Sequence, residues 1–274
     1  METDSRNALK EQGGVSIYDS PLVAVAAADD PWFQKFREPG IIGPEFMVPG
    51  EWLEGARSVI SYFLPFSKEV RESNRHPGMP SEEWLSSRVE GESFNDFLRT
   101  FLTGLIRGMG GDAVAPALDR RYMKYPSSAE ALSARFEGAA LWPGQFINAG
   151  MSSNWSERHV AFAAGLGTFG LHKGLISEKG CAGRYGSVVT TLELRPTVRK
   201  YSHPYEYCPY LMNGGCGACI RRCPSGAIAK EGKNKEVCNT YIETRIHALY
   251  VTRWGCAKCN LNVPCESGIP NGRQ

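Results

Sequence analysis

The first 180 residues of this 274-residue chain contain no cysteine, although the whole chain has nine. No apolar run approaches the roughly 20 residues that cross a bilayer, so we expect no membrane partner. Residues 1–7 are polar and lack the apolar core of an export signal, and no twin arginine lies near them. These absences predict a cytoplasmic protein whose thiols stay reduced.

A strong charge of either sign is also missing. The 31 Lys and Arg residues nearly balance the 29 Asp and Glu residues and leave a net charge of +2. Without a broad basic field, we expect no nucleic-acid partner. Hydrophobic residues make up 42% and charged residues 22%, as in an ordinary globular protein with one large domain or a domain and an appendage.

The cysteines gather near the end of the chain. Eight of the nine lie between Cys208 and Cys265. Residues 216–224 read C-x2-C-x3-C-P, which is the last three quarters of the cluster-binding run of bacterial ferredoxins. Asn213 stands where that run has its first cysteine, and Cys208 can replace it from a longer loop. Eight thiolates are the number that two [4Fe-4S] clusters require.

In ferredoxins the fourth cysteine of the run ligates the other cluster, so the pattern predicts two crossed sets of ligands. The expected sets are Cys208, Cys216, Cys219 and Cys265 for one cluster, and Cys223, Cys238, Cys256 and Cys259 for the other.

Zinc binding and disulfide formation are two other uses of cysteine in proteins. Structural zinc also binds C-x2-C pairs, but Cys-Pro after a three-residue gap and eight ligands from two distant segments favour cubane clusters. Disulfides belong to oxidising compartments, to which nothing in the sequence points. Cys181 lies outside the ferredoxin pattern and is either a small buried residue or a thiol that lines the site.

Apolar runs and capping patterns predict an α/β (α+β) body in residues 1–200, joined to an iron–sulfur domain in residues 201–274. An apolar stripe at helical spacing between Phe94 and Ile106 predicts a helix with one face on the core. Asn154 and Glu157 form a capping-box pattern. The expected elements are strands at 22–28, 58–65, 112–116 and 186–194, helices opening after Asp30, Ser81 and Asn154, and loops at 38–50 and 70–81.

Residues 165–170 read Gly-Leu-Gly-Thr-Phe-Gly and match the dinucleotide fingerprint G-x-G-x-x-G. The fingerprint requires a strand before it and a helix after it. Here the predicted helix comes first, so we do not expect a Rossmann site. The glycines instead predict a backbone that passes close to a large flat ligand or turns tightly under Phe169.

The same stretch carries a family resemblance. The string from Ser153 to Gly170, followed by residues 173–177, resembles the core signature of epoxyqueuosine reductases and reductive dehalogenases. The tail from Cys256 to Glu266 is similar to the last motif of the dehalogenases, and the resemblance covers approximately residues 20–270. The matching core positions are Glu157, Arg158, residues 164–167, Gly170, Leu175, Ile176, Gly186 and Ser187.

The resemblance implies a nitroreductase-like body that binds cobalamin, followed by a two-cluster ferredoxin-like domain. In that family the clusters reduce the corrinoid cobalt, and the cofactor carries the reductive chemistry. We also expect a low-potential electron donor of the ferredoxin or flavodoxin type. The cofactor-binding residues expected in the body are Arg158, Gly165, Leu166, Gly167, Gly170, Arg184 and Ser187.

The sequence departs from both groups in places that bear on the substrate. Epoxyqueuosine reductases carry an Asp proton donor shortly before the Glu-Arg pair, whereas residues 150–155 contain no carboxylate. They also have a tRNA-binding region, whereas this chain ends nine residues after Cys265. We therefore expect a small-molecule substrate. The candidate proton donors are Tyr122, Tyr125, His159 and Tyr185.

Each candidate also has a purely structural interpretation. His159 fits a hydrogen-bonded residue of a capped helix, and Arg158 fits a partner of a carboxylate. The segment 120–125 fits a solvated basic turn. The leading hypothesis is a cobalamin-dependent reductase with two clusters. The alternatives are a reductive activator of a corrinoid held by another protein, and an electron carrier without corrinoid, with a flavin as a possible cofactor of the body.

Overall fold

The structure is a computed structural model that describes residues 4–38, 40–125 and 152–270. Its centre is a four-stranded antiparallel sheet in the order β3-β4-β10-β5. The long middle pair runs from Ser58 opposite Thr190 to Pro65 opposite Gly183. The strands are β3 (Leu22–Ala27), β4 (Ser58–Pro65), β10 (Gly183–Thr190) and β5 (Ala113–Val114).

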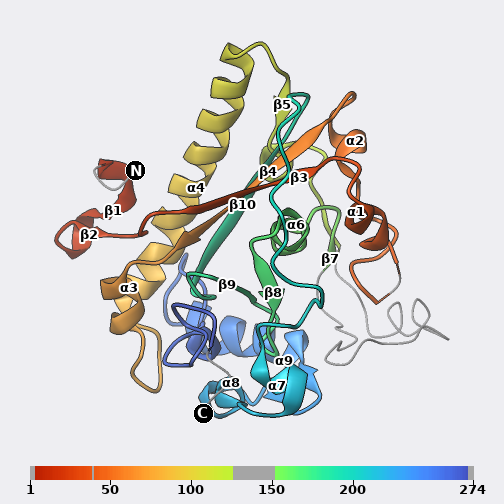
Figure 1. Cartoon of the computed structure of the whole chain (residues 1–274). Coiled ribbons are helices and arrows are strands. Elements are labelled where there is room, and N and C mark those ends of the chain that lie inside the picture. The colour runs from red at the N-terminus through yellow and green to blue at the C-terminus, as the bar shows by residue number, and fades with distance from the viewer. Residues whose placement is uncertain (1–3, 39, 126–151, 271–274) are drawn as a thin grey trace.

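Helices cover both faces of this sheet (Figure 1). Helix α4 (Glu82–Gly108) packs on one face, and α6 (Glu157–Ala164) packs on the other. Side chains along a strand alternate between faces, so Phe63 of β4 enters the core with α6 while Tyr62 and Leu64 enter the core with α4. The predicted α/β class is confirmed by this layered arrangement.

Smaller elements surround the sheet. The pairs β1–β2, β6–β7 and β8–β9 each form a two-stranded sheet. These elements are β1 (Ala8–Leu9), β2 (Val15–Ser16), α1 (Pro31–Lys35), α2 (Pro49–Trp52), α3 (Lys68–Ser73), β6 (Lys124–Tyr125), β7 (Ser152–Ser153), β8 (Gly167–Phe169) and β9 (Leu175–Ser177), with turns η1 (Ser5–Asn7), η2 (Lys10–Gln12) and η3 (Pro116–Leu118).

The C-terminal segment lies at one end of the sheet, next to β8 and β9, where Figure 1 shows it in blue. Its regular elements are short, because loops that carry cysteines interrupt them. They are α7 (Pro209–Asn213), α8 (Ala218–Arg222), β11 (Ile228–Ala229), β12 (Gly232–Lys233), α9 (Lys235–Tyr241), the π-helix η4 (Ile242–His247) and η5 (Lys258–Asn260).

Two helix starts predicted from the sequence are confirmed. Asp30 caps α1 by accepting the Trp32 N–H at 3.0 Å, with Pro31 in the first turn. Ser81 caps α4 by accepting the Trp84 N–H at 3.1 Å, and two glutamates follow it. These caps rest on contacts within three residues, which is why the sequence reveals them.

Three local predictions are wrong. Asn154 does not cap α6, because its amide donates to the Arg121 carbonyl at 2.7 Å and its Oδ1 accepts the Met123 N–H at 2.9 Å; the helix begins after Ser156. The loop expected at 70–81 contains most of α3, which Ser67 caps. The strand expected at 186–194 runs from 183 to 190.

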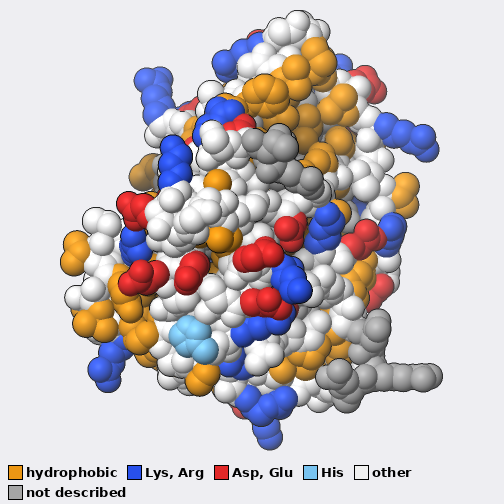
Figure 2. Space-filling model, turned by 90° about the vertical axis from the view of Figure 1, so that its left-hand side faces the viewer, with side chains coloured by type: hydrophobic (Ala, Val, Ile, Leu, Met, Phe, Trp, Pro, Cys, Tyr) orange, Lys and Arg blue, Asp and Glu red, His pale blue; other side chains and the backbone are white. Residues whose placement is uncertain are grey.

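The apolar stripe of α4 is only partly covered. Phe94 and Ile106 are buried, but Phe101 is 53% exposed and Leu105 is 49% exposed. The helix has 27 residues, far more than any strand it crosses, so the sheet covers only part of its apolar face. Figure 2, which looks onto this side, shows hydrophobic side chains gathered toward the top. Across the described ranges, no helix is both long and apolar enough to span a membrane.

Candidate metal centres and the residues around them

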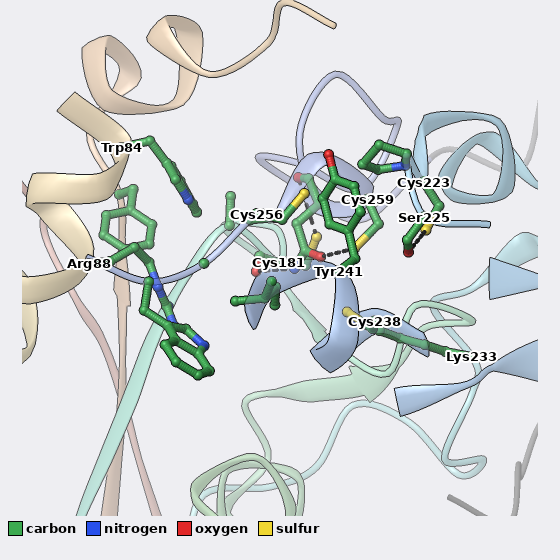
Figure 3. A pocket seen from close by; sticks show the side chains of 18 of the residues that line it. Trp84, Arg88, Cys181, Cys223, Ser225, Lys233, Cys238, Tyr241, Cys256 and Cys259 are labelled. Atoms are coloured by element: carbon green, nitrogen blue, oxygen red, sulfur yellow. Dashed lines mark hydrogen bonds between the residues drawn. The ribbon is translucent and has the colours of Figure 1, made fainter. Parts of the chain in front are cut away.

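Cys181 and four predicted cluster ligands line one pocket of about 200 Å³ (Figure 3). Cys223 ends α8, Cys238 lies in α9, and Cys256 and Cys259 lie around η5. Trp84 and Arg88 of α4 also line this pocket, so it lies between the C-terminal segment and the α4 side of the sheet.

The chemistry of this group suits an iron–sulfur cluster. Burial raises the pKa of Cys259 to about 11; Lys233 lowers it, while Cys256, Cys238 and Cys223 raise it further. Burial also raises the pKa of Cys256, with further contributions from Cys238 and Cys223. Buried thiolates near one another repel, and Cys223, Cys238, Cys256 and Cys259 could hold an iron–sulfur cluster, which would supply the positive charge they lack.

Further cysteines surround Cys219. Burial raises the pKa of Cys219, and the charges of Cys259, Cys265, Cys208 and Cys216 raise it further. Cys208 and Cys219 share an apolar cluster with Leu171 and Ile176 of the β8–β9 region, against which Cys265 packs. Cys208, Cys216 and Cys265 thus lie near Cys219, and Cys259 adjoins this group as well as the pocket. Ligation itself stays a prediction.

Backbone turns place the sulfurs of the two C-x2-C pairs. Gly217 follows Cys216 with φ 76°, and Ala257 follows Cys256 with φ 53°. A residue with positive φ reverses the chain within one step, so both cysteines of a pair can face the same side. Ala257 is unusual here because a side chain disfavours this conformation.

Buried charges tie the cysteine segment to α3. The ammonium of Lys258 is buried and donates to the carbonyls of Asn74 and His76 at 3.1 and 2.7 Å. Glu266 is also buried and accepts from Arg75 at 2.7 Å, with Arg71 at 3.5 Å. Neither Lys258 nor Glu266 is predicted from the sequence. The local signal in each case is its charge directly beside a cysteine.

Cys181 is placed by a close approach of two segments. Its N–H donates to the Cys265 carbonyl at 2.9 Å, and its sulfur lies 3.8 Å from the Cys265 sulfur. A side chain at Gly180 would overlap the carbonyl of Glu266. Cys181 is thus both of the things the sequence allowed, a buried residue and a thiol that lines the pocket of Figure 3.

Three residues expected to act in the body have partners within the fold. Ser187 donates to Glu157 at 2.6 Å and accepts from the Trp155 indole at 2.9 Å. The buried Tyr185 hydroxyl donates to the Leu175 carbonyl at 3.0 Å. Arg184 pairs with Glu92 of α4 at 3.0 Å, on the face away from α6.

Arg158 and His159 lie at the start of α6. Arg158 donates to the Lys173 carbonyl at 2.7 Å, and His159 Nδ1 lies 2.8 Å from the Ser156 hydroxyl. Burial lowers the pKa of His159 well below its usual range, and the charges of Arg158, Lys235 and Lys173 lower it further. Burial also lowers the pKa of Lys235 to about 7 and that of Lys173 to about 8. Arg158 of α6, Lys173 of the β8–β9 turn and Lys235 of α9 therefore lie near one another.

The glycines of the 165–170 string are explained by internal packing. Gly165 ends α6, the buried Leu166 joins the core, and β8 follows, so the string lacks the strand-then-helix context of a dinucleotide site, as predicted. A side chain at Gly167 would overlap the Ile176 carbonyl of β9, and one at Gly170 would crowd His172. These glycines serve contacts within the chain.

The remaining candidates, Tyr122 and Tyr125, lie at the edge of the described structure. Tyr122 packs against the core that contains α6, and burial raises its pKa. Tyr125 lies in β6 opposite Ser152. Residues 150 and 151 of the carboxylate-free stretch lie outside the described residues.

No family model matches this chain, and no curated protein matches it. Solved structures do. An epoxyqueuosine reductase from Streptococcus thermophilus is 17% identical over 92% of this chain and 64% of its own, with a TM-score of 0.49. A structure of a reductive dehalogenase, described with B12-dependent dehalogenation, is 14% identical over 82% of this chain and 28% of its own, with a TM-score of 0.44. The chain thus spans less than two thirds of these relatives, which come from the two groups that its motifs resemble.

One comparison corrects the sequence analysis. A further similar structure is an epoxyqueuosine reductase with a modified tRNA stem loop, 16% identical over 88% of this chain and 60% of its own, with a TM-score of 0.40. The prediction that nucleic acid is not a partner is therefore wrong as stated. It rested on the small net charge and on the short segment after Cys265, and net charge does not describe where charges are placed.

Proposed function

We propose that this chain is an iron–sulfur oxidoreductase in which two [4Fe-4S] clusters, held by residues 201–274, pass electrons to a cobalamin held by residues 1–200. The observation that supports the proposal is the gathering of the eight cysteines: four of them line a single pocket together with Cys181, and Cys208, Cys216 and Cys265 lie near Cys219. Soft thiolates are the ligands that such clusters require.

The junction of the body and the cysteine segment offers positive charge for the cofactor. The bound cobalamin would supply the reductive chemistry at its cobalt. Arg158, Lys173 and Lys235 lie where α6 meets the cysteine segment, and their charges reinforce one another. A cationic group of this kind suits the phosphate of a corrinoid. Arg158 is held in place there by its bond to the Lys173 carbonyl.

The proton for the reductive step would come from a tyrosine. The Tyr185 hydroxyl is committed to a backbone carbonyl, and His159 carries no charge at neutral pH because its pKa is low. Tyr122, partly buried against the α6 core, is the donor we propose, and Tyr125 is the neighbouring control. Tyr122→Phe should slow substrate reduction about a hundredfold, as loss of a general acid does, while Tyr125→Phe changes it little.

The site is compatible with more than one class of substrate, and an experiment identifies which class is reduced. Both small organic molecules and modified nucleic acids accept electrons and a proton from such a centre. Reduced enzyme would be mixed with each class, and substrate-dependent reoxidation would identify the one that is turned over.

The first experiment is anaerobic purification with cluster reconstitution, then assays of iron and sulfide and a cob(II)alamin titration followed by EPR. Two cubanes require about eight irons per chain, and a changed cobalt signal would support cobalamin binding. Eight irons without a cobalt response would leave an electron carrier or a flavin enzyme. Zinc in place of iron would refute the proposal.

A further inference from the structure

A buried histidine reaches the sulfur of a predicted cluster ligand. His172 lies in the turn between β8 and β9 and is only 3% exposed. Its Nε2 lies 3.5 Å from the Cys265 sulfur, within the range of a hydrogen bond to sulfur. No other use of this ring appears in the proposed reaction, and a polar group buried so completely requires a partner.

The hydrogen bonds fix the position of the ring proton. The Gly174 N–H donates to Nδ1 of His172 at 2.9 Å, so Nδ1 is an acceptor and carries no proton. The neutral ring then carries its proton on Nε2, which faces Cys265. His172 is therefore a donor to this sulfur.

Two glycines make room for the ring. The Gly170 N–H donates to the Gly174 carbonyl at 2.8 Å, which closes the turn around His172. A Cβ at Gly170 would lie 2.9 Å from Nε2, and one at Gly174 would lie 2.6 Å from Cε1. Neither position accepts a side chain without moving the imidazole, so the turn is shaped to hold His172 in this place.

Cys181 supplies a second, weaker donor to the same sulfur. Its thiol lies 3.8 Å from the Cys265 sulfur and also 3.8 Å from the Asn260 carbonyl, so its single proton is shared between two acceptors. Two side chains of the body thus converge on Cys265, and the Leu171 backbone also bonds Cys208 of the same predicted ligand set. Around the other group, the Cys259 thiol instead donates to Asn260 Oδ1 at 3.1 Å.

We propose that His172 is a positioning residue that raises the reduction potential of the cluster held by Cys265, with Cys181 as a secondary donor. This inference rests on the proposed function. Reduction adds negative charge to the cluster, and an N–H directed at a ligand sulfur stabilises that charge more in the reduced state. The effect should be confined to one of the two clusters.

The test is an EPR-monitored redox titration of the reconstituted, full-length protein. His172→Leu removes the donor at similar bulk, whereas His172→Gln keeps an N–H near the position of Nε2. For His172→Leu we expect the reduced-to-oxidised ratio of one cluster at a fixed potential to fall about tenfold, which is a shift of 59 mV for a one-electron couple. His172→Gln should restore most of the shift, and the other cluster should not move.

Controls separate this inference from the proposed function. His203→Leu, at an exposed position, should leave both potentials unchanged. Eight irons with unchanged potentials in His172→Leu would overturn the inference and leave the clusters standing. A wild-type protein without eight irons would instead refute the proposed function. If His172→Leu fails to load iron, Cys181 provides a second test. Cys181→Ala should lower the potential of the same cluster, whereas Cys181→Ser keeps a donor and should not. Equal cluster potentials in the two Cys181 variants would overturn the inference.

The three side chains also resemble a mononuclear metal site. The ligand atoms of His172, Cys181 and Cys265 all lie within 4.8 Å of one another. One zinc with about four irons per chain would mean that Cys265 serves this site and no cluster, which would overturn the inference.

Discussion

The cysteine segment and the body treat their chemically active residues in opposite ways. In residues 201–270, cysteines from five separate stretches lie close together. In the body, residues chosen for their type point to different partners: Tyr185 to a carbonyl, Arg184 to Glu92 and Ser187 to Glu157. A spacing pattern that encodes ligand geometry is thus a stronger guide to a site than residue type.

The cause lies in what each pattern must satisfy. A cluster needs several thiolates at fixed separations, so the spacing of the cysteines is itself the requirement. A tyrosine or arginine is useful in many places, because any buried polar group must find a hydrogen-bond partner. Only the fold decides which of them remains available to a ligand.

The largest test of this contrast removes one cysteine group. Cys259→Ser should reduce the iron content from about eight to about four per chain, because one cubane loses a ligand and the other does not. Cys181→Ser is the matched control and should keep the full content. Equal losses in both variants would show that the cysteines do not act as two groups. Iron and sulfide assays provide the measurement.

The junction of the two regions gives the next effect. Gly180→Ala should cost about 3 kcal/mol of unfolding free energy, because it combines a strained φ with overlap of the Glu266 carbonyl. Gly78 has nearly the same φ, 84° against 81°, but open space around it. Gly78→Ala should therefore cost only about 1 kcal/mol. Equal costs in chemical denaturation would mean that this contact does not hold the regions together.

A smaller effect is expected at the buried carboxylate that joins α3 to the cysteine segment. Arg75→Met should cost about 2 kcal/mol, because it removes the short ion pair to Glu266 and leaves that buried carboxylate with the Asn262 N–H and the longer contact to Arg71. Glu72→Gln removes the exposed partner of the same arginine and should cost well under 1 kcal/mol. Thermal and denaturant unfolding of the two variants measure these two losses of unfolding free energy. Equal losses would mean that the buried pair contributes no more than the exposed pair.

The smallest effect concerns Lys235, a cation of α9 in the cysteine segment. The pKa of Lys235 is about 7 in the folded chain, against about 10.4 when unfolded. Between these values the unfolded chain binds the extra proton, so stability rises with pH from about 7 to about 10. Lys235→Met should flatten this rise by about 1 kcal/mol, while the exposed Lys200→Met should not. The free energy of unfolding of both variants, measured across this pH range, is the test. The same flattening in both would contradict the prediction.

Local signals predicted much of the fold. The strands β3 and β4 follow from apolar runs, and the starts of α1 and α4 follow from Asp30 and Ser81. The errors occur where distant residues compete. Asn154 has the chemistry of a cap, but the chain near residue 122 offers its amide better partners.

The sequence by itself predicted which cysteines are candidate cluster ligands, because ligand spacing is written along the chain, and it determined the α/β class through its apolar periodicity. Tertiary structure decided which other residues reach those cysteines. His172 lies 93 residues before Cys265 and Lys258 lies 184 residues after Asn74, and no local pattern connects them. Such contacts arise only when packed elements bring distant segments together, since burial then requires each polar group to find a partner.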